Sequence, residues 1–299
     1  MKIIKGIEKA KLTISKFNGL SNRLDSDQNS ESRKIVAEII ERVRKDGDSA
    51  LKYYAQSFEK VELKQVEVDS KVINNAANKV PKELLDALVK ASDRITAFHK
   101  ESMPKEWSDT NAGYGSIVRA VEKAGLYIPG GTALYPSTVL MSAIPAKIAG
   151  VSEVIICTPS KTGLPHDYIL AAAKIANVDR IFTIGGAQAI AAMAYGTETV
   201  PKVDLICGPG NIFVTLAKKQ VYGDVGIDGI YGPTETMIVA DETADPELCI
   251  YDLMAQAEHD EQSIPTLVTT SHQIAEFVQK SWKTLAEEIL NDDSSKETS

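Results

Sequence analysis

Three apolar runs decide the fold: Val154-Ile155-Ile156-Cys157-Thr158, Ile181-Phe182-Thr183-Ile184-Gly185 and Val203-Asp204-Leu205-Ile206-Cys207-Gly208. Each run is short and almost wholly apolar, as are strands buried on both faces of a parallel sheet. Each is followed by a helical pattern, over 168–176, 187–194 and 212–221. This alternation is typical of successive βαβ units. It predicts an α/β fold with a doubly wound, incomplete Rossmann-like parallel sheet and helices on both faces.

The sequence on either side of these runs predicts further elements. Apolar residues recur at helical spacing over 30–58, with an interruption at Gly47, and again over 81–98, while residues 61–68 alternate like a strand. After the runs we expect a strand over 236–240, a helix from Pro246 to about His259, a strand over 265–270 and an amphipathic helix over 274–289. The length suits two main domains.

The composition is that of a globular protein. The 299 residues include 33 Lys and Arg against 41 Asp and Glu, a net charge of −8. Because the chain is acidic, we expect no nucleic acid partner and no attachment to anionic membranes. The most apolar stretches are too short to span a bilayer, and the start does not resemble a signal peptide. Three scattered cysteines, interpreted as buried thiols, favour a reducing cytoplasm.

Several middle strands are followed by glycine-containing turns: Tyr127-Ile128-Pro129-Gly130-Gly131, Gly185-Gly186-Ala187-Gln188 and Gly208-Pro209-Gly210-Asn211. In an open parallel sheet, ligands bind at the carboxyl ends of the strands, and a glycine turn before a helix suits a nucleotide phosphate. None of these turns has the GxGxxG pattern with a later acidic residue. Glycines that serve only as tight turns would explain the same pattern.

A second group of candidate residues lies at the end of the helix expected after Pro246. In Gln256-Ala257-Glu258-His259, a spacing of three places Gln256 and His259 on one helix face, where both could reach one ion. Zinc favours histidine, but two ligands are half of the usual four. A helix-end histidine held by solvent or by the helix dipole explains the spacing as well. The turn Gly232-Pro233-Thr234-Glu235 could face the same cleft or be an ordinary turn.

Taken together, these motifs have a fixed order. The first glycine turn is followed by Pro136-Ser137-Thr138-Val139-Leu140-Met141, then by the motifs that contain Gln188, Asn211, Thr234 and His259. In this order they resemble the histidinol dehydrogenase family, from about Ser30 to the end. The resemblance implies an NAD-dependent, zinc-containing homodimer that oxidises L-histidinol to L-histidine through an aldehyde, in the last steps of histidine biosynthesis.

The resemblance also implies roles for individual residues. Tyr127, Gln188 and Asn211 fall at positions that contact NAD. Gln256 and His259 fall at two zinc-ligand positions that also contact the substrate, and Thr234 falls where the family usually has a substrate-contacting serine.

Two departures from the family pattern bear on function. The chain has Tyr231-Gly232-Pro233-Thr234-Glu235 where the family usually reads Ala-Gly-Pro-Ser-Glu, which adds bulk near the substrate. One alternative is therefore a dehydrogenase of the same superfamily for another hydroxyl substrate, such as a sulfonated diol. The family pattern also continues beyond this length, with a Glu-His acid/base pair and two further zinc ligands. We therefore expect a truncated chain with no catalytic acid/base residue, inactive alone, and a non-catalytic nucleotide-binding remnant is the second alternative.

The resemblance also predicts the domain boundaries. Residues 1–20 form an N-terminal extension that in the family helps dimer contacts. Residues 126–234 form the NAD-binding Rossmann-like domain, and residues 21–125 and 235–299 form a discontinuous α/β domain that carries the metal-ligand helix.

Overall fold

The computed structural model of the chain describes residues 3–14, 29–130, 134–231, 235–259 and 263–296. For residues 235, 259, 286 and 288–296 only the backbone is described. The chain divides into two compact units: a large unit of residues 20–231, and a small unit of residues 1–19 and 232–299.

This division differs from the boundaries expected from the sequence. Residues 30–125 lie in one unit with 126–231, because helices from the N-terminal part cover the central sheet. The sequence pattern instead grouped residues 21–125 with 235–299. That grouping stays a prediction for the assembled protein.

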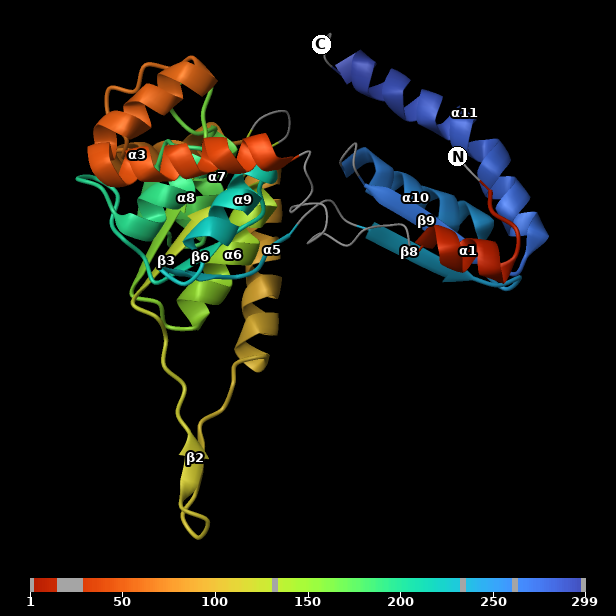
Figure 1. Cartoon of the computed structure of the whole chain (residues 1–299), viewed down its shortest axis with the longest axis horizontal. Coiled ribbons are helices and arrows are strands. Elements are labelled where there is room, and N and C mark those ends of the chain that lie inside the picture. The colour runs from red at the N-terminus through yellow and green to blue at the C-terminus, as the bar shows by residue number, and fades with distance from the viewer. Residues whose placement is uncertain (1–2, 15–28, 131–133, 232–234, 260–262, 297–299) are drawn as a thin grey trace. The chain divides into compact units, whose positions relative to one another are not determined.

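A five-stranded parallel sheet forms the centre of the large unit (Figure 1). The strand order is β5-β4-β3-β6-β7, and every neighbouring pair is parallel. The chain moves outward from β3 to β5 and then returns past β3 to β6, which confirms the predicted doubly wound α/β fold. The strands are β3 (Lys123–Tyr127), β4 (Glu153–Cys157), β5 (Arg180–Phe182), β6 (Leu205–Cys207) and β7 (Gly226–Ile227).

One face of this sheet is covered by α3 (Ser30–Tyr54), α8 (Gly186–Tyr195) and α9 (Ile212–Val221). The buried side of α3 follows the helical spacing seen in the sequence. As predicted, α3 is interrupted at Gly47, which has a φ of 52°. Asp48 then accepts hydrogen bonds from the Thr197 hydroxyl (2.6 Å) and from the Thr199 hydroxyl. These bonds tie α3 to the segment that follows α8.

The other face is covered by α4 (Ser70–Asn75), η3 (Ala76–Lys79), α5 (Lys82–Glu101), α6 (Pro136–Ile148) and α7 (Asp167–Ile175). Helices therefore lie on both faces, as predicted.

The strand expected over residues 61–68 does not form. Its apolar side chains are buried as the pattern predicts, but a single antiparallel bridge joins Glu67 to Phe182 at the edge of β5. The segment is fixed there by Arg180, whose guanidinium donates to both carboxylate oxygens of Glu67 at 2.7 Å. A strand-like pattern of buried apolar residues can therefore arise from a segment that lies along a sheet edge without a hydrogen-bonded ladder.

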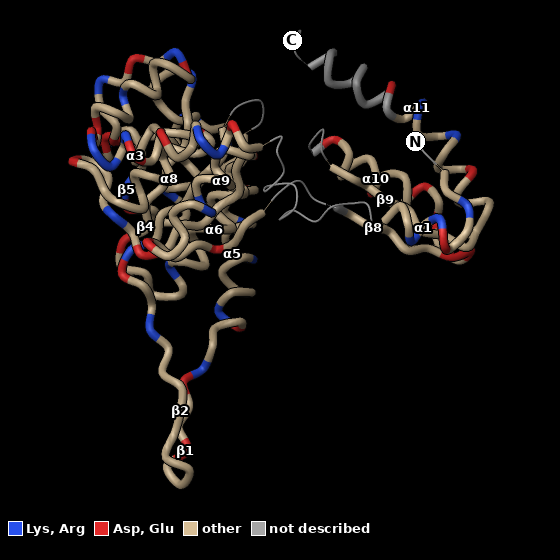
Figure 2. The backbone as a smooth tube through the Cα atoms, viewed as in Figure 1, with Lys and Arg blue, Asp and Glu red and all other residues tan. Residues whose placement is uncertain are grey.

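A hairpin of β1 (Trp107–Asp109) and β2 (Tyr114–Ser116) projects from the rest of the large unit (Figure 1). Its residues are exposed and mostly uncharged, whereas Lys, Arg, Asp and Glu are scattered over the outer helices (Figure 2). The rings of Trp107 and Tyr114 meet edge to face with centroids 5.7 Å apart. Such an aromatic pair stabilises a two-stranded ribbon that has no further strand to pair with.

The small unit contains a parallel pair, β8 (Glu235–Ala240) and β9 (Ile264–Thr269). Helices α10 (Pro246–His259) and α11 (His272–Lys296) pack on this pair around a core that includes Ile250, Leu253 and Val278. The strands, the helix from Pro246 and the amphipathic helix predicted here are all present. The unit also contains α1 (Ile7–Ile14).

Within the described segments, we find no helix with the length and apolar character needed to cross a bilayer. Cys157 and Cys249 are buried and Cys207 is half-buried, and all three are free thiols. Burial raises the pKa of Cys207 to about 11, and burial also raises the pKa of Cys157. Cys157 and Cys207 are therefore neutral near pH 7 and behave as small apolar groups.

Candidate cofactor site

The strand order places the candidate site. The winding direction reverses between β3 and β6, and in open α/β sheets ligands bind at such a switch point, outside the carboxyl ends of the strands. Tyr127 is the last residue of β3, and Gly208 follows β6. A side chain at Gly208 would collide with the backbone of Tyr127, since an added Cβ would lie 2.1 Å from its carbonyl oxygen. The two loops therefore meet at the switch point.

Tyr127 connects the end of β3 to the start of α8. Its side chain is buried, and its hydroxyl oxygen accepts a hydrogen bond from the Gly186 N–H at 3.1 Å. Burial raises the pKa of Tyr127 to about 12. The phenol is therefore neutral at physiological pH and fixes the first turn of α8.

Gln188 lies in that first turn and is only 3% exposed. Its side chain folds back over Gly186, where an added Cβ would lie 2.8 Å from Gln188 Oε1. Gly186 also has a φ of 62°, a conformation that favours glycine. The glycine turn seen in the sequence thus has a defined purpose, which is to let Gln188 and Tyr127 approach one point of the backbone.

Asn211 is the N-cap of α9. Its Oδ1 accepts hydrogen bonds from the N–H groups of Phe213 (3.1 Å) and Val214 (3.2 Å). The residue is exposed, so its amide nitrogen is available at the surface of the switch point. Tyr127, Gln188 and Asn211, which the resemblance links to NAD, therefore come from the ends of β3, β5 and β6 at one edge of the sheet.

Glu59 is a further residue of this edge that the sequence analysis did not identify. It ends the π-helical turn η2 (Ala55–Glu59), and its carboxylate accepts a hydrogen bond from the Ser160 N–H (3.4 Å) and another from the Gly185 backbone. Burial raises the pKa of Glu59, while these two N–H groups act in the opposite direction. No local motif marks Glu59, because its partners lie about a hundred residues away in sequence.

These contacts change what the glycine turns can bind. A free helix N-terminus suits phosphate, but side chains already hold backbone N–H groups at the start of α8 and of α9. Glu59 adds a hydrogen-bonded carboxylate beside α8. The groups present therefore suit the hydroxyl and amide groups of a dinucleotide better than a phosphate on α8, which agrees with the missing GxGxxG pattern.

A buried ion pair supports the loop that leads to Asn211. The side chain of Lys218 is 3% exposed, and its ammonium group donates to the Asp228 carboxylate and to the Gly208 carbonyl (3.1 Å). The other carboxylate oxygen of Asp228 accepts the Gly208 N–H at 2.8 Å. Tyr231 closes over this pair, with its ring centroid 5.2 Å from the ammonium nitrogen. Both backbone groups of Gly208 are thus bonded to the pair.

The expected metal-ligand residues lie in the small unit. Gln256 is half-buried in α10, where its Oε1 accepts a hydrogen bond from the Thr236 hydroxyl (2.7 Å) and its amide lies 3.4 Å from Ser263 Oγ. For His259 only the backbone is described, and Thr234 lies outside the described residues. Among the side chains that are described, no three His, Cys, Asp or Glu come together as a metal site. The described donor set therefore does not complete a zinc site.

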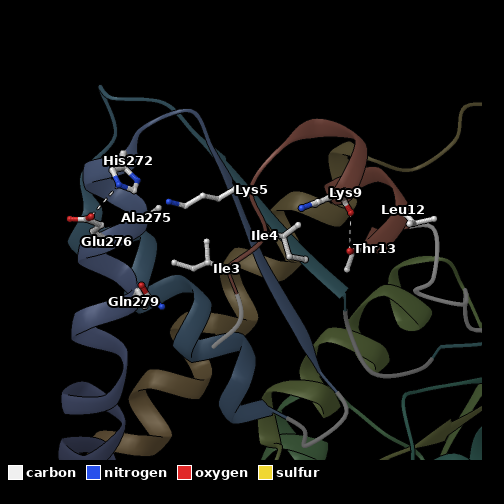
Figure 3. Close-up of a pocket in the computed structure, with 10 residues that line it drawn as sticks. All are labelled: Ile3, Ile4, Lys5, Lys9, Leu12, Thr13, His272, Ala275, Glu276 and Gln279. Carbon is white, nitrogen blue, oxygen red and sulfur yellow. Dashed lines mark hydrogen bonds and ion pairs between the residues drawn. The ribbon is translucent and has the colours of Figure 1, made fainter.

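The small unit also has a hollow of about 670 Å³ between residues 3–13 and α11 (Figure 3). Ile3 and Ile4 line it, and Lys5 extends toward His272, which lies 3.1 Å from Glu276 on the same helix. Gln256 is not among the described residues that line it.

Comparison with known proteins decides the family, because the profile described as histidinol dehydrogenase matches residues 22–298. The chain belongs to the histidinol dehydrogenase family. It is 47% identical to histidinol dehydrogenase of Dehalococcoides mccartyi (strain CBDB1) over 288 residues, which are 93% of this chain and 66% of the relative. The corresponding protein of Methanocaldococcus jannaschii is 48% identical over 248 residues, 81% of this chain and 58% of the relative.

The crystal structure of histidinol dehydrogenase from Elizabethkingia anophelis is similar, with a TM-score of 0.80 and 37% identity. The match covers 85% of this chain and 60% of that chain. The resemblance stated from the sequence motifs is therefore confirmed, and so is membership of an oxidoreductase family. The chain spans about 58 to 66% of the length of these relatives. The roles of individual residues stay predictions.

The Lys218 and Asp228 pair yields a stability prediction. Asp228→Ala should lower the free energy of unfolding by roughly 3 kcal/mol, because it leaves a buried ammonium group without its carboxylate. Urea denaturation followed by circular dichroism measures this loss. The exposed Asp224, which accepts one hydrogen bond from Tyr195, gives the control: Asp224→Asn should cost less than about 1 kcal/mol. Equal losses for the two variants would contradict the buried pair.

The raised pKa of Tyr127 predicts a pH dependence. The folded-state pKa of about 12 exceeds the unfolded value of 10, so the neutral phenol contributes stability that is fully present below pH 10 and lost as the pH rises toward 12. The free energy of unfolding should fall by about 2 to 3 kcal/mol more in the native chain than in Tyr127→Phe over this range. Urea titrations at several pH values measure the difference. If the free energy of unfolding falls equally with pH in the native chain and in Tyr127→Phe, Tyr127 ionises normally.

Proposed function

We propose that this chain forms part of an NAD-dependent histidinol dehydrogenase, which oxidises L-histidinol to L-histidine through the aldehyde in histidine biosynthesis. The observation that carries the proposal is the meeting of Tyr127 and Gln188 at the start of α8, with Asn211 at the neighbouring strand end, in a chain of this family. A switch point lined by uncharged hydrogen-bonding groups supports dinucleotide binding.

The residues at this edge would hold NAD through neutral groups. Asn211 would donate from its amide nitrogen while its oxygen caps α9, and Gln188 would present an amide beside the buried phenol of Tyr127. Because the Tyr127 hydroxyl already accepts the Gly186 N–H, its own proton is available to a ligand. When bound, NAD supplies the acceptor for the hydride that leaves the alcohol carbon.

For the small unit, we propose that Gln256 and His259 supply two ligands to a zinc ion and that Thr234 contacts the substrate. This part rests on family membership. The described residues do not complete a zinc site. Zinc binding through Gln256 would require its Oε1 to share or exchange the hydrogen bond from Thr236.

The proposal extends to partners and location. The small-molecule substrate is proposed from the family. The acidic net charge of −8 argues against a nucleic acid or anionic membrane partner, and the free thiols support a cytoplasmic location. A homodimer is proposed from the family. The dehydrogenase activity is proposed for a protein of the relatives' length, because this chain spans about 58 to 66% of that length.

Cofactor binding tests the proposal without requiring turnover. The 299-residue chain should bind NAD in isothermal titration calorimetry. Asn211→Asp should weaken binding about tenfold, because aspartate still caps α9 but lacks the amide donor and repels the dinucleotide phosphates. Asn177→Asp, at an exposed turn with a φ of 54°, is the matched control and should not change the affinity. Absence of NAD binding would overturn the proposal.

Turnover distinguishes the alternatives. The 299-residue chain should form no NADH from histidinol, whereas a version extended to the length of the relatives should do so, as followed by absorbance at 340 nm. Activity of the extended version on a sulfonated diol instead would favour the other superfamily substrate. NAD binding with no turnover of either compound by the extended version would favour a non-catalytic remnant. NADH formation from histidinol by the 299-residue chain would contradict the expected inactivity.

A further inference from the structure

The strand order indicates where an acidic residue that binds the cofactor ribose is expected. In a dinucleotide-binding sheet of order 3-2-1-4-5, an acidic residue near the end of the second strand binds the ribose hydroxyls. Here β3 occupies the first position and β4 the second. The residues that follow β4 are Thr158, Pro159 and Ser160, none of which has a carboxylate. The expected acid is therefore missing from its usual place in the sequence.

Glu59 brings a carboxylate to that place from another part of the chain. The helical segment that begins with α3 ends at Glu59, and Lys60 then turns the chain with a φ of 60°. The Glu59 carboxylate accepts from the Ser160 N–H, in the loop after β4. Its other oxygen lies 3.0 Å from the position of an added Cβ on Gly185, in the loop after β5. The carboxylate thus lies between the loops that follow the second and third strands.

The Glu59 carboxylate is held by backbone groups. Its hydrogen bonds come from backbone N–H groups of Ser160 and Gly185, and among the described residues no Lys or Arg forms an ion pair with it. The ammonium group of Lys60 points elsewhere, because it donates to the Ser57 carbonyl. Tyr127 and Gln188 lie at the adjacent start of α8. The carboxylate is therefore beside the two buried residues proposed to contact NAD, and no described cation compensates its charge.

We propose that Glu59 determines the cofactor specificity of this site: its carboxylate accepts hydrogen bonds from the adenosine ribose hydroxyls of NAD and repels the 2′-phosphate of NADP. The inference rests on the proposed NAD function. Ribose hydroxyls are donors that an ionised carboxylate can accept, whereas the oxygens of a phosphate offer no donor and add negative charge. Discrimination between NAD and NADP therefore arises from repulsion of the 2′-phosphate as much as from the hydrogen bonds to the ribose hydroxyls.

The test compares the affinities for NAD and NADP by calorimetry with the whole 299-residue chain. The native chain should bind NADP at least about 100-fold more weakly than NAD. Glu59→Gln keeps the shape but removes the charge, so it should improve NADP binding about tenfold or more and weaken NAD binding by about threefold to tenfold. Glu62→Gln, an exposed glutamate on the same segment, is the matched control and should leave both affinities unchanged.

The outcomes separate this inference from the proposed function. If the native chain binds neither dinucleotide, the proposed function and this inference both fail. If it binds NAD but Glu59→Gln weakens NAD and NADP equally, Glu59 only holds the two loops and the inference alone is overturned. Glu59→Ala provides a second variant should the glutamine variant unfold, as judged by circular dichroism, and it should shift the NADP to NAD ratio in the same direction.

Discussion

The pairing of β3 with β4 on one side and β6 on the other is the constraint on which the rest of the large unit depends. Helix α8 packs closely on the central strand β3, since a Cβ at Gly125 would lie 2.5 Å from the sulfur of Met193. It also places the loops after β3 and β6 against each other at Gly208. Once these two pairings are formed, the switch point, the candidate cofactor residues and the two apolar cores on either face follow.

Side-chain capping then determines the chemistry of this edge. In many dinucleotide-binding folds a free helix N-terminus receives phosphate. Here the hydroxyl of Tyr127 and the carboxylate of Glu59 bond to the start of α8, and Asn211 caps α9. A capped terminus has fewer free N–H groups to offer, so side chains are the main hydrogen-bonding groups that this edge presents. The same hydrogen bonds hold Tyr127, Glu59 and Asn211 in place, and such preorganisation lowers the entropy lost when a ligand binds.

The ion pair of Lys218 and Asp228 gives the loop after β6 its shape. A buried pair of this kind is costly to desolvate, and it is retained where both partners make further hydrogen bonds. Here those additional bonds go to the N–H and the carbonyl of Gly208, three residues before Asn211. The pair thus stabilises the loop at the position where its backbone passes Tyr127. Tyr231, which departs from the family pattern, packs over this pair in the large unit.

Local sequence determined the strands, the helices and the family of this protein. Apolar runs, helical spacing around α3 and α10, and the glycine turns are short-range patterns, because burial on a strand or helix repeats every two or 3.6 residues. Tertiary structure alone decided the edge pairing of residues 61–68, the packing of α3 on the central sheet and the position of Glu59. Those features join residues about a hundred positions apart, and no spacing rule within a segment encodes such contacts.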